Sequence, residues 1–292
     1  MACSRRLFAA QMFAGGVAAG YARYMEPGWF DLTTTRIAIP NAKPFRLLHL
    51  SDLHISDGIT ADELAYALQL GLAAKPDVIC FTGDFVSSTT GFDHDGLRRV
   101  LRRAVAAAPA FAVMGNHDGG RWLGRWGGDC TSRMMRDLVG GTGIEVLHNR
   151  SAMWNGVSFV GTGDLYADEF DANASFCKVD QRMPTIVLCH NPDGKDRIAA
   201  GRWDLMLSGH THGGQVRFGN LPAPWAPVND KRFLAGLCNW NGRQLFITRG
   251  VGSPKHVRLG CRPEVSVLEI SHASRQRNAP KPAPDQTGIL ST

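Results

Sequence analysis

The sequence lacks the cysteine pattern of a disulfide-stapled or zinc–thiolate protein. Its 292 residues include seven cysteines, an odd number, and no two of them are spaced as Cys-x-x-Cys. Paired cysteines at short, regular spacings are the usual sign of a disulfide framework or a structural zinc site. Cys80 and Cys189 lie inside apolar runs, where we expect them to be small core residues. The sequence therefore argues against both cysteine-dependent classes.

The central part of the chain also lacks an excess of charge of one sign. The formal net charge is +6, but residues 1–24 carry +3 and residues 272–292 carry +2, which leaves about +1 for the body. Proteins that bind a nucleic-acid backbone usually present a basic track. We therefore expect no nucleic-acid partner. The composition, 44% hydrophobic and 20% charged, is ordinary for a globular chain of this length.

The N-terminal apolar run is slightly short for a membrane-spanning helix. Leu7–Ala22 is uncharged but has only 16 residues, three of them glycine, whereas a span needs about 20. Arg5 and Arg6 precede it, and the pair resembles a twin-arginine export signal. We predict that residues 1–24 are such a signal or a membrane anchor and that the protein resides in the cell envelope. The alternative is a cytoplasmic enzyme with a basic N-terminus. Residues 272–292, rich in Pro, Ala and Ser, are predicted to be a disordered tail.

Strands and helices are predicted to alternate in the first half of the body. Apolar runs at 45–50, 77–82 and 110–114 indicate strands, and apolar residues at helical spacing lie between them at 61–74 and 97–108. A short helix at 134–139 and a strand at 144–147 follow. The second half is strand-rich, with predicted strands at 157–160, 185–189, 205–207, 234–237, 245–248 and 265–270. The Asn241-Gly242 pair marks a hairpin turn. We predict one domain over residues 40–270, built from two sheets.

Metal-binding side chains follow five of these predicted strands. The segments are Asp52-Leu53-His54, Gly83-Asp84, Gly115-Asn116-His117-Asp118, His190-Asn191 and Gly209-His210-Thr211-His212. In an extended chain, residues two apart project to the same side, so each Asp-x-His or His-x-His pair can face one ion. Each segment alone is weak evidence, but five in order after strands predict a metal centre. Carboxylate, amide and imidazole ligands without a thiolate suit Mn²⁺, Fe or Zn²⁺.

This ordered set resembles the calcineurin-like metallophosphoesterase superfamily over about residues 45–270. The chain is most similar to the bacterial YaeI-type phosphodiesterases, through residues 26–30, 189–193, 203–207, 230–232, 248–253 and 261–265. The resemblance implies a four-layer αββα sandwich with two mixed sheets face to face and helices outside. It also implies two divalent ions, with Mn²⁺ favoured and Zn²⁺ or Fe as alternatives. Asp52, His54 and His212 would hold the first ion, Asn116, His190 and His210 would hold the second, and Asp84 would bridge both.

The implied activity is hydrolysis of a phosphodiester or pyrophosphate by a hydroxide that the two ions activate. His117 would protonate the leaving group, and Asp118 would either orient His117 or cap a turn. Arg249, Lys255 and Arg258 are candidate contacts for the substrate phosphate, with ordinary surface charge as the alternative. Residues 83–88 read Gly-Asp-Phe-Val-Ser-Ser and so depart from the Gly-Asp-x-x-Asp-Arg-Gly segment of the superfamily's Ser/Thr protein phosphatases.

The substrate is expected to be a small-molecule or lipid-linked phosphodiester. Some relatives cleave the pyrophosphate of UDP-2,3-diacylglucosamine in lipid A synthesis, and such a pyrophosphatase is the alternative within the enzymes. An interaction scaffold with the same fold is the non-enzymatic alternative, and it is disfavoured because all seven expected ligands are present. Trp122 and Trp126, each preceded by an arginine, would form an interfacial belt beside the active site if their segment were helical. The alternative is that both tryptophans pack on the core.

Overall fold

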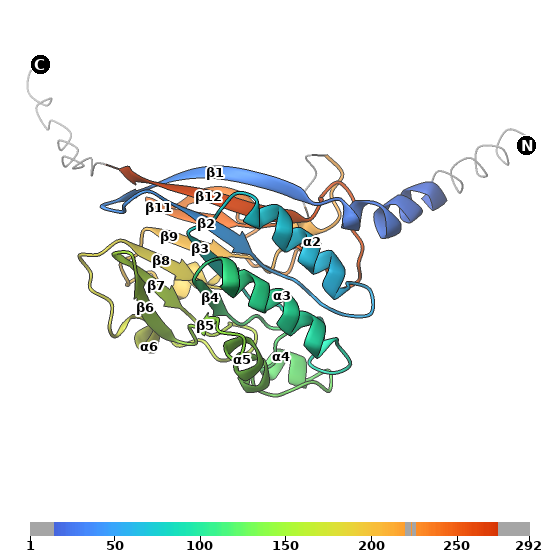
Figure 1. Cartoon of the computed structure of the whole chain (residues 1–292), viewed down its shortest axis with the longest axis horizontal. Coiled ribbons are helices and arrows are strands. Elements are labelled where there is room, and N and C mark those ends of the chain that lie inside the picture. Colours follow the sequence, from blue (N-terminus) through green and yellow to red (C-terminus); the bar gives the residue numbers. More distant parts are fainter. Residues whose placement is uncertain (1–14, 220–222, 224–225, 274–292) are drawn as a thin grey trace, which may run out of the picture.

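The first half of the chain builds a sheet from βαβ units, as the sequence predicts. The computed structural model describes residues 15–219, 223 and 226–273 (Figure 1). Strands β2 (Phe45–Leu50), β3 (Val78–Thr82), β4 (Ala110–Val113) and β5 (Glu145–Val146) pair in parallel in that order. Two further strands complete the sheet beside β2: β12 (Glu264–Ala273), antiparallel to β2, and β1 (Asp31–Pro40), parallel to β12.

The second half builds another six-stranded mixed sheet. Its spatial order is β10 (Gly236–Trp240), β11 (Arg243–Ile247), β9 (Leu205–Ser208), β8 (Thr185–Leu188), β7 (Val157–Gly161) and β6 (Arg150–Trp154). The β10–β11 hairpin turns at Asn241 and Gly242, which both have positive φ, as the Asn-Gly signal predicts.

The two sheets pack face to face and have helices on their outer sides. Alternate residues of both sheets form the shared core, in which the rings of Phe111 and Phe159 stack 4.8 Å apart. The outer face of the first sheet is covered by α2 (Ala61–Leu72), α3 (His94–Ala107) and α5 (Arg133–Gly140). The second sheet has a thinner outer layer, formed by α6 (Ala172–Phe176) and α7 (Gly194–Arg197) with their flanking loops. The predicted four-layer αββα sandwich is confirmed, with unequal helical layers.

The folded body extends beyond the predicted domain bounds of 40 and 270. β1 begins at Asp31, and its alternating exposure, with polar Thr33–Thr35, is that of an edge strand without a continuous apolar run. Before it, the carboxylate of Glu26 in the short helix η1 (Glu26–Gly28) accepts hydrogen bonds from the Gly260 and Cys261 amides, at 3.0 and 2.6 Å. β12 continues to Ala273, two residues into the predicted tail, because its last residues pair with β1. Strand β6 was not predicted, and β10 starts two residues later than predicted.

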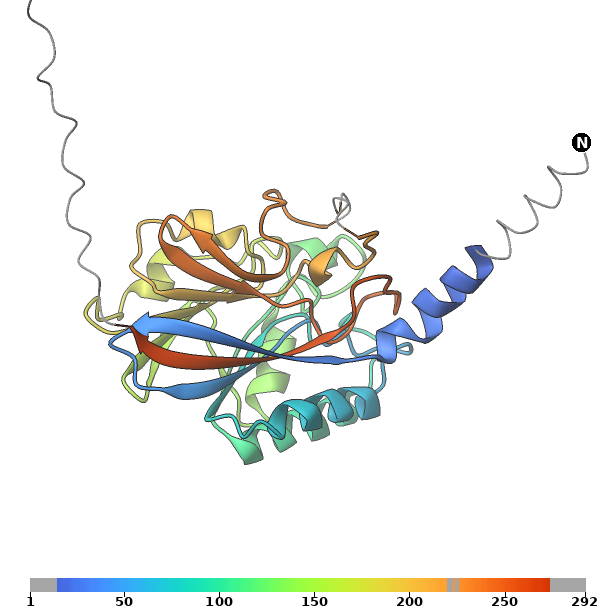
Figure 2. The ribbon, with the colours of Figure 1, turned by 90° about the horizontal axis from the view of Figure 1, so that it is seen from above.

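Residues 15–24 are helical and project from the body beside β1 (Figure 2). The rest of the predicted signal, residues 1–14 with the arginine pair, lies outside the described residues, as does the remainder of the predicted tail, 274–292. Within the described part of the chain, no helix combines the length and the apolar character that a bilayer crossing requires.

Candidate metal centre

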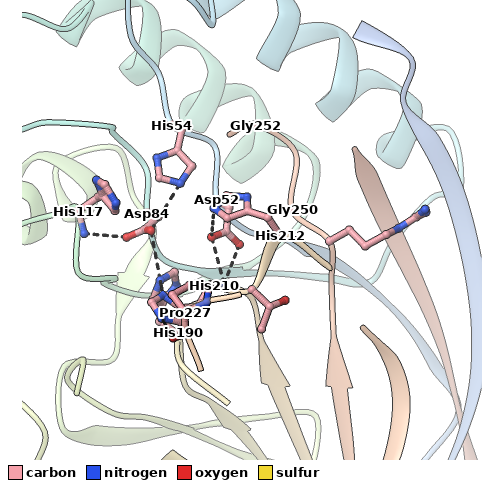
Figure 3. A network of polar contacts seen from close by, with 12 residues as sticks. Asp52, His54, Asp84, His117, His190, His210, His212, Pro227, Gly250 and Gly252 are labelled. Atoms are coloured by element: carbon pink, nitrogen blue, oxygen red, sulfur yellow. Dashed lines mark hydrogen bonds and ion pairs between the residues drawn. The ribbon is translucent and has the colours of Figure 1, made fainter. Parts of the chain in front are cut away.

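The predicted ligands converge at one edge of the two sheets. Each lies just after the carboxyl end of β2, β3, β4, β8 or β9, where the chain turns across the sheet edge. Figure 3 shows the side chains from these loops pointing toward one another. All seven are buried: Asp52, His54, Asp84, Asn116, His190, His210 and His212. The loops of two separate sheets therefore assemble one cluster.

The backbone at this cluster is left-handed rather than extended. Asp52, His54, Asp84, His210 and His212 have φ between 50° and 67°, a region that costs a non-glycine residue about 1 kcal/mol or more. The side chains of Asp52 and His54, and those of His210 and His212, do converge. They converge because the backbone turns between them, and not because they project from one side of an extended strand, as the sequence predicted. Backbone bonds across the sheet hold the conformation, including His54 N–H to the Asp84 carbonyl at 3.0 Å.

Glycine at position 209 permits the close approach of the two sheets at this edge. A Cβ atom there would overlap the Ser51 hydroxyl and the Asp52 carboxylate. The amide of the next residue, His210, donates to both carboxylate oxygens of Asp52, at 3.0 and 3.1 Å. The glycine thus lets a ligand loop of the second sheet dock directly on a ligand of the first.

The ligand atoms fall into two groups joined by Asp84. Asp52, His54 and His212 form one group, and Asp84, His190 and His210 form the other, each with ligand atoms within 4.8 Å of one another. The Asp84 Oδ2 atom lies 3.2 Å from His190 Nε2 and 3.5 Å from His54 Nε2 (Figure 3). This carboxylate oxygen therefore lies between the two groups, in the position that a bridging ligand requires.

Two backbone carbonyls orient the rings of His190 and His210 so that one nitrogen of each faces the other. The Thr82 carbonyl lies 2.6 Å from His190 Nδ1, and the Pro227 carbonyl lies 2.8 Å from His210 Nε2. Because a carbonyl only accepts, those two nitrogens carry the protons. His190 Nε2 and His210 Nδ1 are therefore the nitrogens that face each other, 3.2 Å apart, and His190 Nε2 also lies 3.2 Å from Asp84 Oδ2. Burial opposes protonation of His190, but the Asp84 carboxylate raises its pKa well above the usual value, so Nε2 carries a proton. A divalent ion could replace that proton among the same three atoms, and the geometry fits a metal ion in this sense.

Orphaned polar atoms support the same fit. His54 Nε2 and the Asn116 Oδ1 atom are buried and have no hydrogen-bond partner among the residues that the structure describes. A buried acceptor without a partner is costly, and such atoms in native proteins usually serve a function. Both atoms belong to residues of the predicted ligand set. The donor set, three kinds of oxygen and nitrogen ligand without sulfur, is suited to divalent ions such as Mn²⁺ or Zn²⁺.

Burial sets the charge states of the cluster. It lowers the pKa of His54 and of His210 to about 3, which keeps both imidazoles neutral, as metal ligands must be. It raises the pKa of Asp52 to about 6. Burial opposes ionisation of Asp84 too, but the neighbouring His190 and His117 hold its pKa well below the usual range. The cluster therefore holds a buried anion that demands positive charge nearby.

His117 is held in position by backbone contacts. Its amide donates to Asp84 Oδ1 at 2.8 Å, and its Nδ1 donates to the Ser87 carbonyl at 2.8 Å. Since Nδ1 carries that proton, Nε2 is the atom left for chemistry. The ring lines a cavity of about 300 Å³ that the ligands Asp84, Asn116, His210 and His212 also line. His117 thus lies beside the two ligand groups and belongs to neither.

Asp118 does not orient His117. Its two carboxylate oxygens accept from the amides of Gly115, Asp84 and Phe85, each at 2.8 Å. These bonds tie the β3 and β4 loops together beneath the cluster. The proposed catalytic role of Asp118 is therefore corrected: it is the capping carboxylate given as the alternative, and the Ser87 carbonyl is what orients His117.

Two aromatic residues that complete the cavity were not among the predicted site residues. Tyr166 lines the cavity, its ring lies 5.1 Å from that of His210, and its hydroxyl donates to the Pro227 carbonyl at 3.0 Å. The signal for it was Gly163-Asp164 after β7, because Asp164 Oδ1 accepts from the Tyr166 amide at 2.7 Å and so turns the loop. Trp122 also lines the cavity, 4.5 Å from the His117 ring.

The two predicted belt tryptophans lie in different surroundings. The helix α4 (Arg121–Gly124) is a single turn and ends before Trp126, which is 76% exposed. Trp122, by contrast, is partly buried against His117. The helical pair of Trp122 and Trp126 considered from the sequence is therefore not formed, and only Trp122 lines the cavity.

A buried ion-pair network fixes the loop that supports His210. Asp193 accepts from the Asn229 and Asp230 amides, at 2.7 and 3.3 Å, and the almost fully buried Lys195 lies within 4 Å of the Asp193 and Asp230 carboxylates. This network fixes the loop that carries Pro227, whose carbonyl sets the His210 tautomer. Two of the segments that carry the family resemblance, 189–193 and 230–232, meet here.

Two of the three residues predicted to contact the substrate phosphate bind other groups of the protein instead. The Arg258 side chain is fully buried and donates to the backbone carbonyls of Arg249, Gly250, Gly252 and Cys261. Arg249 pairs with Glu264 and Asp31, each at 3.1 Å. For Arg258 the substrate assignment is corrected, because no guanidinium face reaches the cavity. Lys255 is exposed beside the cavity residue Pro254 and stays a prediction.

Replacing Arg258 by Met is expected to destabilise the fold without a specific effect on substrate binding. Several buried carbonyls would lose their donor, which should lower the free energy of unfolding by about 3 kcal/mol or more. Urea unfolding would measure it, with Arg36→Met, at a side chain 88% exposed, as the control. A raised KM at unchanged stability would instead restore Arg258 as a substrate contact.

The comparisons with known proteins agree with this geometry. The model of the calcineurin-like phosphoesterase family matches residues 45–214, which contain all seven predicted ligands. Phosphodiesterase YaeI of Escherichia coli is 40% identical over 261 residues, or 86% of this chain and 92% of that protein. The uncharacterized metallophosphoesterase YkuE of Bacillus subtilis is 28% identical over 91% of this chain and 97% of its own length. UDP-2,3-diacylglucosamine pyrophosphatase LpxG of Chlamydia muridarum is 25% identical over 85% of this chain and 91% of its own length.

Proposed function

The chain belongs to the calcineurin-like phosphoesterase family, and we propose that it is a metal-dependent phosphodiesterase acting on phosphodiester or pyrophosphate bonds. The observation that carries the proposal is the Asp84 carboxylate oxygen, which lies between His54 of one predicted ligand group and His190 of the other. The similarity to phosphodiesterase YaeI over most of both chains supports the diester preference.

The predicted ligands would hold two divalent ions, and Mn²⁺ is proposed from the mixed oxygen and nitrogen donors. Ions held there would stabilise charge on the phosphoryl oxygens and make the attacking water more acidic. The protein's own contribution is positioning. The left-handed loops fix the ligand atoms, and the Pro227 carbonyl fixes the His210 tautomer. His117 places Nε2 in the cavity, where its imidazolium form, with Nδ1–H held by the Ser87 carbonyl, would give the Nε2 proton to a leaving oxygen and become the neutral imidazole.

A pair of chromogenic substrates tests this function. With Mn²⁺ added, the purified full chain is expected to cleave bis-p-nitrophenyl phosphate with a kcat/KM roughly tenfold or more above that for p-nitrophenyl phosphate. A chelator should abolish both activities, and added Mn²⁺ should restore them. Preference for the monoester would overturn the diesterase assignment and keep the metal site. No turnover with both ions bound would favour a demanding substrate or the scaffold alternative.

A second candidate function is hydrolysis of the UDP-2,3-diacylglucosamine pyrophosphate bond. The observation in its favour is the match to LpxG across most of both chains, although at 25% identity it is distant. Release of UMP from this substrate, measured by chromatography, would separate it from the general diesterase. We further propose that the protein resides in the cell envelope. This proposal rests on the sequence alone, through the Arg5-Arg6 pair that resembles a twin-arginine signal.

A further inference from the structure

The N-terminal helix presents apolar surface without a protein partner in the described part of the chain. Residues 15–19 read Gly-Gly-Val-Ala-Ala and are all exposed, and Val17 is 57% exposed. The attachment to the body comes later, at Ala22, whose carbonyl accepts from the Arg258 amide at 2.9 Å. The helix therefore extends away from the body (Figure 2), and in sequence its uncharged run continues back to Leu7.

Exposed aromatic and apolar residues follow this helix where it joins the body: Tyr24 is 79% exposed, Met25 63% and Trp29 56%. Phe218, which is 60% exposed, follows Arg217, whose amide bonds the neighbouring segment at Leu259. Cations accompany the rings: the Arg23 guanidinium lies 5.2 Å from the Tyr24 ring centre, and that of Arg262 lies 4.5 Å from the Trp29 ring centre. Aromatic rings and arginines at the end of an apolar segment match the polar–apolar boundary of a bilayer.

Hydrogen-bonded backbone segments connect these exposed residues to the catalytic cavity. Gln215 and Val216 line the cavity, and Phe218 follows them. The Arg217 amide donates to the Leu259 carbonyl at 2.7 Å, while the next residues, Gly260 and Cys261, donate to the Glu26 carboxylate. Two neighbouring backbone segments thus separate the cavity from the helix end, a span of about 10 Å at ordinary strand spacing.

We propose that Val17, Tyr24, Met25, Trp29 and Phe218, together with Arg23, form a docking surface for an anionic lipid bilayer. Docking would place the cavity mouth beside the headgroups, so the substrate class is a lipid-linked phosphoester. The substrate part rests on the proposed phosphodiesterase function, whereas the docking part does not. The charge of Arg23 beside the Tyr24 ring complements acidic headgroups, whereas Arg262 beside Trp29 is paired with Asp31 at 2.6 Å. One cation near an anionic surface contributes about fivefold in partitioning.

Vesicle binding tests the docking surface without any hydrolysis. Full chain would be mixed with vesicles of phosphatidylcholine alone or with phosphatidylglycerol, and flotation would measure partitioning. Arg23→Gln is expected to weaken binding to the anionic vesicles about fivefold. The matched control is Arg182→Gln, whose side chain is 89% exposed and lies before the amino end of β8, away from the cavity. Equal partitioning of the two variants would overturn the charge argument.

Brominated phosphatidylcholine tests which part of the chain touches the bilayer. Tryptophan emission should be quenched, and Trp29→Phe should remove much of the quenching. Binding in which Trp29 stays unquenched would mean that residues 1–14 alone hold the protein, and the proposal would be wrong. Self-association that Tyr24→Ser and Phe218→Ser abolish, without vesicle binding, would instead identify the surface as a contact between two copies.

Two substrates separate the docking surface from the chemistry. Phe218→Ser is expected to slow cleavage of a vesicle-embedded lipid p-nitrophenyl phosphodiester and to leave bis-p-nitrophenyl phosphate cleavage unchanged. The matched control is Met153→Ser, at an equally exposed residue on the distant edge strand β6. Equal rates of Phe218→Ser and the parent on both substrates would contradict the lipid assignment. Absence of hydrolysis by the parent would count against the proposed function and not against docking.

Discussion

Replacing Asp84 by Ala is expected to reduce kcat/KM for the diester by a factor on the order of 10⁴, the largest loss of any single ligand. Its Oδ2 atom lies between the two ligand groups, 3.5 Å from His54 Nε2 and 3.2 Å from His190 Nε2, so both ions would lose a ligand. Its other oxygen accepts the His117 amide, so the substitution also frees the residue that faces the leaving group. Two functions of the site thus depend on one side chain.

Metal content distinguishes the cause of that loss. Elemental analysis of the parent protein should find two ions per chain, and Asp84→Ala should retain fewer. Asp84→Asn keeps an acceptor for the His117 amide but removes the charge, so it should lose metal while it keeps the His117 loop in place. Asp57→Ala, at an exposed residue just after the first ligand motif, is the control. Two tightly held ions in Asp84→Ala would refute the bridging assignment.

The convergence of the predicted ligands could be foreseen from sequence because each of them follows an apolar strand. β3 and β4 are buried along their whole length, so they appear as continuous apolar runs, and the polar residues after them stand out. Parallel neighbours end at the same sheet edge, which brings these residues together whatever the detailed turn. The local conformation was not predictable in the same way. The left-handed backbone at five ligands depends on bonds between loops that are distant in sequence, such as His54 to Asp84.

The roles of Arg258 and Asp118 were predicted wrongly because their partners also come from loops that are packed together only in the folded protein. An arginine in a polar segment suggests an exposed, phosphate-binding cation, yet Arg258 is buried and donates to the carbonyls of residues 249, 250, 252 and 261, which only the folded loop brings together. Asp118 is next to His117 in sequence, but its carboxylate points toward the amides of another loop. Adjacency in the chain therefore gave the wrong partner for Asp118, and a polar sequence context gave the wrong exposure for Arg258, whereas the apolar runs of the strands predicted correctly which loops meet.

His117→Ala is expected to separate proton donation from metal chemistry. For a diester with an alkoxide leaving group, the loss should be about 10²–10³-fold in kcat, because the leaving oxygen needs a proton as the bond breaks. For p-nitrophenolate, a stable anion, the loss should be much smaller. The structure supports this split: His117 is outside both ligand groups, and its protonated Nδ1 bonds to the Ser87 carbonyl, which leaves Nε2 for the leaving group.

The measurement is the dependence of log kcat on leaving-group pKa across a series of diesters. The parent should show a shallow slope, and His117→Ala a steeper one, with its metal content unchanged. His148→Ala is the matched control, since that histidine is partly buried but lies after β5, outside the ligand groups. An equal loss for all leaving groups would mean that the His117 side chain positions the substrate and does not donate the proton, since His117→Ala retains the backbone amide that bonds to Asp84.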